Sequence, residues 1–222
     1  MSRLLLRDLC VGALFISLLI LLGYALQLDD RIARHYFDSA SQSFPLKSSW
    51  LFQGLLHDQL KKLPVLVALV LLLRLLYLLA RRRFADMRHS GYLLLAMALA
   101  AGLVGLVRAH SPVACPWSLT QYGGDLPFLQ PWQLFQGGVG HCWPSGHAAG
   151  GFCLLAFFFW LRAQGSRHAW TVLTLVLLVG GIMGWAQLVR GAHFLSHVSW
   201  SLLFCWLVTG LLACLWWRKP AV

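Results

Sequence analysis

The sequence predicts an all-α membrane protein, a polytopic bundle of six transmembrane helices. Hydrophobic residues fill 59% of the 222 positions and charged residues only 11%, whereas soluble domains carry roughly a quarter of charged residues. A helix needs about 20 mostly apolar residues to cross the hydrocarbon core of a bilayer. Six runs meet or approach this length, at residues 9–26, 63–80, 92–107, 148–161, 170–188 and 194–217.

Three of these runs need comment. The run at 9–26 is too long for a signal peptide core and lacks a small-residue cleavage site, so we expect it to be retained as a helix. The run at 63–80 contains Arg74, which we expect to extend toward the headgroups unless it faces the bundle interior. The run at 148–161 is short, so we expect its helix to begin earlier.

The basic residues predict the orientation of the chain. The net charge is +11, and Arg residues cluster before the first run, after the last run and in two short connections. Short basic loops stay in the cytoplasm, so both termini are expected there and the segments 27–62 and 108–146 outside. Basic residues next to apolar runs favour anionic lipid headgroups as partners, and we expect no nucleic-acid partner. Residues 29–40 are expected to form an amphipathic helix on the membrane surface.

The acidic residues are few, which makes histidine the main candidate for acid–base chemistry. All seven acidic residues are Asp and none is Glu, so acid–base chemistry is expected to rest on the nine histidines or on a loop Asp. Three clusters of polar residues fall at the predicted outer ends of the helices: Arg108 with His110; His141, Ser145 and His147; and Gln187, Arg190, His193 and His197.

The middle cluster has the features of an anion site at a helix start. Pro144 and Ser145 are typical of the first positions of a helix, and Gly146 lets the backbone approach a ligand closely. Unpaired N–H groups at a helix N-terminus attract anions, and His147 in the first turn would be placed to donate a proton. The alternative is a helix cap without a further role.

The last cluster has helical spacing. His193 and His197 are four residues apart and lie on one helix face. Arg190 joins that face if the helix continues through Gly191, unless this glycine marks a turn. The pair has three interpretations: a nucleophilic histidine positioned by its neighbour, two metal ligands, or polar residues at the membrane interface.

Two cysteines lie in the predicted outer segment. An oxidising compartment favours disulfides, so we predict a Cys115–Cys142 bridge that ties the start of the segment 108–146 to the following helix. The other four cysteines lie in apolar runs, where cysteine is usually a small buried hydrophobe.

The motif Pro144-Ser145-Gly146-His147, followed by His193 at the start of the last run, resembles the type-2 phosphatidic acid phosphatase superfamily, in its bacterial membrane branch. The resemblance is clearest over 108–197, the core of a single domain expected over 1–222. The membrane members of this family are six-helix enzymes that hydrolyse lipid phosphates.

Two other motifs of the family are in register but altered. The first, Lys-x6-Arg-Pro, falls on Arg108 and on Cys115 followed by proline. The third, Ser-Arg-x5-His-x3-Asp, falls on Gln187, His193 and His197. Cys115 and Gln187 therefore stand in place of two phosphate-binding arginines, and His197 in place of an orienting carboxylate. Arg190 is the expected substitute for phosphate binding, and further positive charge is expected from one of two histidines: His110 or His141.

The resemblance implies a mechanism. His193 attacks the phosphorus and forms a phosphohistidine, His147 protonates the leaving lipid oxygen, and His197 orients His193. The phosphate oxygens are then held by a group of basic side chains and backbone amides: Arg108, Ser145, Gly146 and Arg190. No cofactor and no metal are expected.

The implied substrate is a membrane lipid phosphate such as phosphatidic acid, phosphatidylglycerophosphate, polyprenyl diphosphate or lipid A. The implied location is the bacterial inner membrane, with cytoplasmic termini and a periplasmic, extracytoplasmic active site. Three alternatives remain: a lipid phosphotransferase, a catalytically inactive relative that binds headgroups, and a metal-dependent enzyme or transporter. The ligands of the last would be His193, His197 and either His141 or His147, with Asp125 as the nearest acidic candidate.

Overall fold

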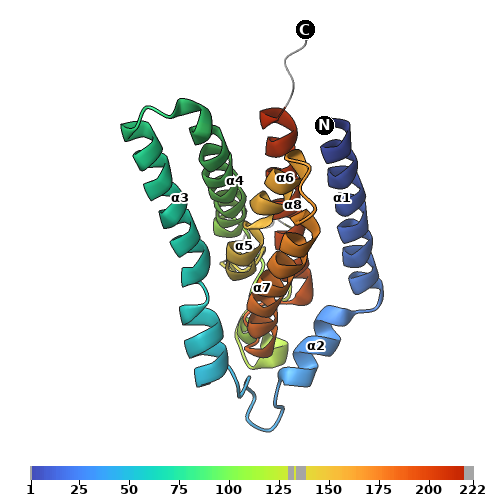
Figure 1. Cartoon of the computed structure of the whole chain (residues 1–222). Helices are drawn as coiled ribbons and strands as arrows, with labels where there is room; N and C mark the ends of the chain where they lie inside the picture. The colour runs from blue at the N-terminus through green and yellow to red at the C-terminus, as the bar shows by residue number, and fades with distance from the viewer. Residues whose placement is uncertain (1, 130–132, 134–138, 218–222) are drawn as a thin grey trace.

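The computed structural model of the chain is a bundle of helices, and it describes residues 2–129, 133 and 139–217 (Figure 1). Within these residues, six helical segments are long and apolar enough to cross a membrane, which confirms the predicted fold class. They are α1 (Ser2–Ala25), α3 (Lys62–Ala80), α4 (Phe84–Ala109), α5 (Gly146–Phe152) with α6 (Leu155–Ala163), α7 (Ala169–Val189) and α8 (Leu195–Trp216).

Two spans differ in detail from the sequence prediction. The second span is longer, because the π-helical segment η1 (Trp50–Gln59) precedes α3 and the two together form an apolar stretch over Trp50–Ala80. The fourth span begins at Gly146, as its shortness indicated, and is divided into α5 and α6 just after two adjacent glycines.

The two long connecting segments, between α1 and α3 and between α4 and α5, lie at one end of the bundle (Figure 1). A short helix, α2 (Leu28–Tyr36), follows α1 and contacts α7 and α8. Two 3-10 turns, η2 (Pro116–Ser118) and η3 (Thr120–Tyr122), lie in the connection between α4 and α5. The start of α1 and the end of α8 lie at the opposite end. Both predicted outer segments therefore share one end, while the membrane side of that end stays a prediction.

The helix α8 is the centre of the packing, in contact with α1, α4, α5 and α6. On the α1 side, the Trp206 indole covers Gly12 and its Nε1–H donates to the Leu9 carbonyl at 3.0 Å. Large apolar side chains on the outer faces of α1 and α3 remain exposed, such as Leu14 and Val65, as expected of surfaces that face lipid. Arg74 is exposed as well, so it does not face the bundle interior.

Helices α5 and α7 pack through glycines. A Cβ placed at Gly151 would lie 2.6 Å from the Cα of Gly180, and a Cβ at Gly180 would overlap the Phe152 ring. Small residues allow such close backbone approach between membrane helices. This contact holds the end of α5 against the middle of α7.

We predict that Gly180→Ala destabilises the protein while Gly181→Ala does not. The new methyl group at 180 meets the Phe152 ring, and overpacking of this kind costs about 1–3 kcal/mol, whereas position 181 has open space around it. Thermal unfolding of the detergent-solubilised variants tests this. Equal unfolding temperatures for the two variants would contradict the proposed close packing.

Candidate functional site

The start of α5 is attached to α8 by two hydrogen bonds, one from the Ser145 N–H and one to the Ser145 carbonyl. The Ser145 N–H donates to the His197 carbonyl at 3.1 Å. The Ser201 hydroxyl lies 2.9 Å from both the Ser145 and the His197 carbonyl oxygens. The Ser145 hydroxyl in turn caps α5 by accepting from the Ala148 N–H at 3.4 Å. Ser145 and Ser201 are fully buried, so the first turn of α5 has a fixed position relative to His197.

The turn between α7 and α8 carries the next residues of the site. The Ala192 N–H donates to the Gln187 carbonyl at 2.9 Å, and Gly191 has a φ of 67°. This is the Schellman arrangement that ends helices at a glycine. Gly191 therefore marks a turn, and Arg190 does not share a helical face with His193.

His193 lies just before α8 and is buried, with 7% of its surface exposed. Its Nδ1 lies 3.4 Å from the Nδ1 of His197 and 3.5 Å from the Sγ of Cys142. A backbone group of Cys142 also hydrogen-bonds to the ring. The Cys142 N–H already donates to the Val113 carbonyl, so this group is the Cys142 carbonyl. The Nδ1 side of the His193 ring therefore contacts other protein groups, and Nε2 is the nitrogen left for a ligand.

The surroundings of His193 favour its neutral form. Burial lowers the pKa of His193 well below its ordinary value, and the positive charges of His197, Arg108 and His147 lower it further. The hydrogen bond with Cys142 acts in the opposite direction and is the smaller effect. Arg108 and His147 thus lie close enough to act on His193, although they come from separate helices.

A disulfide joins Cys115 to Cys142. It connects two parts of the α4–α5 connection that are 27 residues apart in sequence. The Trp117 N–H also donates to the Gly191 carbonyl at 2.9 Å. The connection is therefore attached to the α7–α8 turn, and Cys142 is held beside His193.

Arg108 reaches the start of α5 from the end of α4. Its Nε donates to the His141 carbonyl at 2.9 Å. Its Nη1 would lie 3.6 Å from a Cβ placed on Gly146, so the guanidinium covers the first residue of α5. Because Arg108 is also exposed, its remaining N–H groups can meet a ligand from outside.

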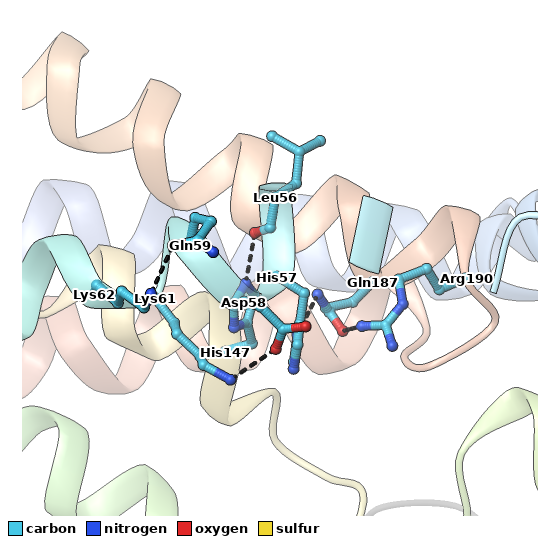
Figure 2. Close-up of polar contacts among 9 residues, drawn as sticks. All are labelled: Leu56, His57, Asp58, Gln59, Lys61, Lys62, His147, Gln187 and Arg190. Atoms are coloured by element: carbon cyan, nitrogen blue, oxygen red, sulfur yellow. Dashed lines mark hydrogen bonds and ion pairs between the residues drawn. The ribbon is translucent and has the colours of Figure 1, made fainter. Parts of the chain in front are cut away.

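His147 makes two contacts with the segment η1, shown in Figure 2. Its Nε2 lies 3.1 Å from the Leu56 carbonyl oxygen. Its ring stacks on the ring of His57, with centroids 4.4 Å apart and planes inclined by 27°. Leu56 and His57 were not among the site residues predicted from the sequence. The only available signal was a histidine close to the second apolar run, in a segment expected at the same end of the bundle.

Gln187 and Arg190 continue this network (Figure 2). The Nε2 of Gln187 lies 3.3 Å from the Nδ1 of His57, and its Oε1 accepts from the Nη1 of Arg190 at 3.1 Å. The Nε of Arg190 donates to the Lys47 carbonyl at 2.9 Å. Arg190 is buried, and burial lowers its pKa while the charge of Asp58 raises it. Among the described residues, no carboxylate lies within ion-pair distance of Arg190.

The geometry can now be compared with known proteins. The family model of the PAP2 superfamily matches residues 89–221, more than half of the chain. The chain belongs to the PAP2 superfamily. This confirms the resemblance to type-2 phosphatidic acid phosphatases inferred from the motif at 144–147.

One curated relative is similar to this PAP2 protein over most of its length. It is the lipid A 4'-phosphatase of Francisella tularensis subsp. novicida (strain U112), 26% identical over 198 residues that cover 86% of this chain and 87% of the relative. No solved structure matches the chain.

The remaining candidates from the sequence lie outside this group of contacts. His110 is exposed, and its ring Nδ1 lies 2.9 Å from the Leu106 carbonyl oxygen. The side chains of His141 and Asp125 are exposed as well. In the part of this PAP2 protein that the structure describes, the side chains of His110, His141 and Asp125 contact neither the His193 pocket nor the His147 network.

The donor set for a metal is small. Ligand atoms of Cys142, His193 and His197 lie within 4.8 Å of one another. The Cys142 sulfur is engaged in the disulfide, which leaves two imidazoles, whereas zinc centres usually have at least three protein ligands. In the described part of the chain, the pair does not fit a metal centre.

An apolar cavity of about 690 Å³ opens beside His147. Its polar lining side chains are those of Lys61, Lys62 and His147. Its walls are apolar side chains from α3, α4 and α5, with one contribution from α7: Pro64, Val65, Ala68, Leu94, Met97, Ala98, Ala101, Cys153 and Met183. In this PAP2 protein an apolar cavity that suits a lipid chain therefore lies next to the site.

We predict that Ser201→Ala destabilises the protein more than Ser199→Ala. The first substitution removes the hydrogen bond from α8 to the Ser145 carbonyl, which then keeps only the Ala149 N–H of its own helix. A hydrogen bond of this kind contributes about 0.5–1.5 kcal/mol. The Ser199 hydroxyl bonds only to the Leu195 carbonyl of its own helix. Thermal unfolding of the two variants in detergent is the measurement, and a larger loss for Ser199→Ala would argue against the attachment of α5 through Ser201.

Proposed function

We propose that this PAP2 protein hydrolyses a phosphate ester or diphosphate on a membrane lipid, with His193 as nucleophile and His147 as general acid. The main support is the convergence of a buried neutral histidine with a second histidine and an arginine. Arg108 lies in α4, His147 in α5 and His193 just before α8, and the first two act electrostatically on His193.

The nucleophile is the Nε2 of His193. Its Nδ1 side faces Cys142 and His197, so Nε2 keeps the lone pair that attacks phosphorus. An N–P bond forms while the bond between phosphorus and the lipid oxygen breaks, which gives a phosphohistidine and a lipid alkoxide or phosphate leaving group. His197 orients the ring of His193 from the next helical turn.

His147 supplies and recovers the proton. A carbonyl oxygen can only accept, so the Nε2 of His147 carries hydrogen and donates it to Leu56. The Nδ1 is then the nitrogen that protonates the leaving oxygen. In the second step the same Nδ1 takes a proton from water, which attacks the phosphohistidine and releases phosphate.

The phosphate oxygens are bound by positive charge and backbone amides. Arg108 lies over Gly146, whose N–H is directed outward at the helix start. Ser145 uses its own N–H, carbonyl and hydroxyl oxygen within the protein, so its part is to position this turn. Arg190 is a buried cation without a carboxylate within ion-pair distance in the described chain, and a substrate anion would compensate it.

No metal is required by this scheme. Arginines and N–H groups placed around a transferring phosphoryl group supply the electrostatic stabilisation on which such reactions depend. We therefore propose a metal-independent reaction without a cofactor.

The apolar cavity next to His147 supports a substrate whose chain stays in the bilayer while its phosphate reaches the site. The relative from Francisella is named for lipid A as its substrate, so lipid A is the first candidate. We place the protein in a bacterial inner membrane, with the site in the periplasm, where the disulfide is favoured.

We predict that His193→Ala and His147→Ala each reduce phosphate release by at least about 100-fold, the lower range of what acid–base catalysis contributes. The assay uses detergent-solubilised protein with a chelator and a panel of lipid A, phosphatidic acid, phosphatidylglycerophosphate and polyprenyl diphosphate. His168→Ala is the control, because His168 is an exposed residue of the α6–α7 connection.

Activity that survives both substitutions would refute the assigned roles. Activity abolished by the chelator and restored by a divalent metal would refute metal independence. Phosphate found on a second lipid rather than in solution would identify a phosphotransferase.

The pH dependence is a separate prediction. His193 must be neutral to attack, and burial lowers its pKa below the ordinary 6.5. A lowered pKa keeps the ring neutral as the pH falls, so activity is lost only below pH 6.5, when the pH approaches the lowered value. The test is the acid limb of kcat/KM against pH. A midpoint at or above 6.5 would contradict the buried, neutral nucleophile, and Arg108→Gln is expected to move the midpoint to higher pH.

A further inference from the structure

His57 and Gln187 have no role in the steps described above, yet they belong to a network that includes His147. Its members come from three elements: His57 from η1, His147 from α5, and Gln187 with Arg190 from the end of α7 (Figure 2). Such a network of partly buried polar side chains restricts the protonation states of its members, because each hydrogen bond needs one donor and one acceptor.

We propose that His57 is a positioning residue for His147, and that Gln187 and Arg190 keep His57 neutral so that His147 is the ring of the stacked pair that carries the proton. This inference rests on the proposed role of His147 as general acid.

The hydrogen-bond directions follow from Arg190. A guanidinium only donates, so the atom of Gln187 that faces Arg190 is the carbonyl oxygen Oε1. The other atom, Nε2, is a donor and faces His57. The Nδ1 of His57 must therefore accept, and it carries no hydrogen. His57 is fixed as the neutral tautomer with its hydrogen on Nε2.

Because the two rings are stacked, the neutral state of His57 affects the protonation of His147. The ring centroids of His57 and His147 are 4.4 Å apart, and two positive rings at this distance repel each other. A neutral ring instead offers its π face to a neighbouring cation. The Leu56 carbonyl, which accepts from His147, also favours a protonated His147.

The charges around His57 act on both rings of the stacked pair. The charged groups that face it are Arg190 from α7 and, from its own segment, Lys61 and Asp58. Asp58 is itself paired with Lys61, whose Nζ lies 2.8 Å from its Oδ1. Because Arg190 and Lys61 act on both rings, the tautomer set by Gln187, and not the surrounding charge, distinguishes His57 from His147.

The inference also gives a reason for glutamine at 187, where the family motif has arginine. An arginine at 187 would present only donors to Arg190. Glutamine offers an acceptor to Arg190 and a donor to His57 at the same time. The change at 187 and the presence of arginine one turn later are therefore parts of one arrangement.

The first test compares three substitutions of His57 by their pH–rate profiles. His57→Phe keeps a flat neutral ring, so we expect kcat within about threefold of the unmodified protein and an unchanged profile. His57→Ala removes the ring, with an expected loss in kcat of about tenfold, part of the contribution of a general acid, at unchanged KM. His57→Arg places a permanent cation against His147, so its basic limb is expected to move to lower pH by about one unit or more.

Gln187→Leu is the second test, because it releases His57 from its neutral tautomer. We expect a lower kcat, and a partial recovery in the double variant with His57→Phe, since phenylalanine cannot take up a proton. Additive losses, or a basic limb that does not move in His57→Arg, would overturn the proposal.

A third measurement is independent of activity. In ¹⁵N-histidine-labelled protein in detergent, with signals assigned through His57→Phe and His147→Ala, NMR at decreasing pH should show His147 taking up a proton before His57. The Nδ1 of His57 should stay unprotonated meanwhile. Protonation of His57 first would overturn the inference whether or not the protein hydrolyses lipids. Conversely, activity unaffected by His193→Ala would refute the proposed function and leave this NMR result intact.

Discussion

The hydrogen bond from the Ser145 amide to the His197 carbonyl is the constraint on which the rest of the site depends. Ser145 precedes α5 and His197 lies in α8, and the Ser201 hydroxyl bridges the carbonyl oxygens of both. Within a bilayer, backbone groups that leave their own helix must find partners in the protein. The bond satisfies this requirement and also sets where His147 lies relative to His193. Two motifs separated by about 50 residues thus become one site.

The electrostatics of the site follow from the composition. The chain has no Glu and few Asp, and the groups that act on His193 are His197, Arg108 and His147. Asp29, a half-buried carboxylate, contacts the start of α8, where it accepts from the Ser196 N–H at 2.8 Å. Burial raises its pKa and the Ser196 hydrogen bonds lower it. The result is a pocket of positive character, suited to an anion that brings its own charge.

Much of the fold could be predicted from the sequence, because span length and apolar composition are local properties. The six helices and the helix start at Ser145 are cases of this kind, whereas the pairing of Cys115 with Cys142 was predicted from the expected compartment. The contribution of His57 could not be predicted. It depends on how η1 continues α3 and on the stacking with His147, which are tertiary properties. Likewise, the sequence left open whether a helix continues through Gly191 or ends there, and the hydrogen bonds of the turn show that it ends.

The histidines of this site are oriented by carbonyl oxygens of the main chain, that of Leu56 for His147 and that of Cys142 for His193. A carboxylate in the same place would lose its charge in acid and release the ring that it holds. An amide carbonyl has no proton to gain in this range. The orientation of the two rings therefore does not depend on their ionisation. Acid can protonate an imidazole here while the carbonyl oxygen that orients the ring stays unchanged.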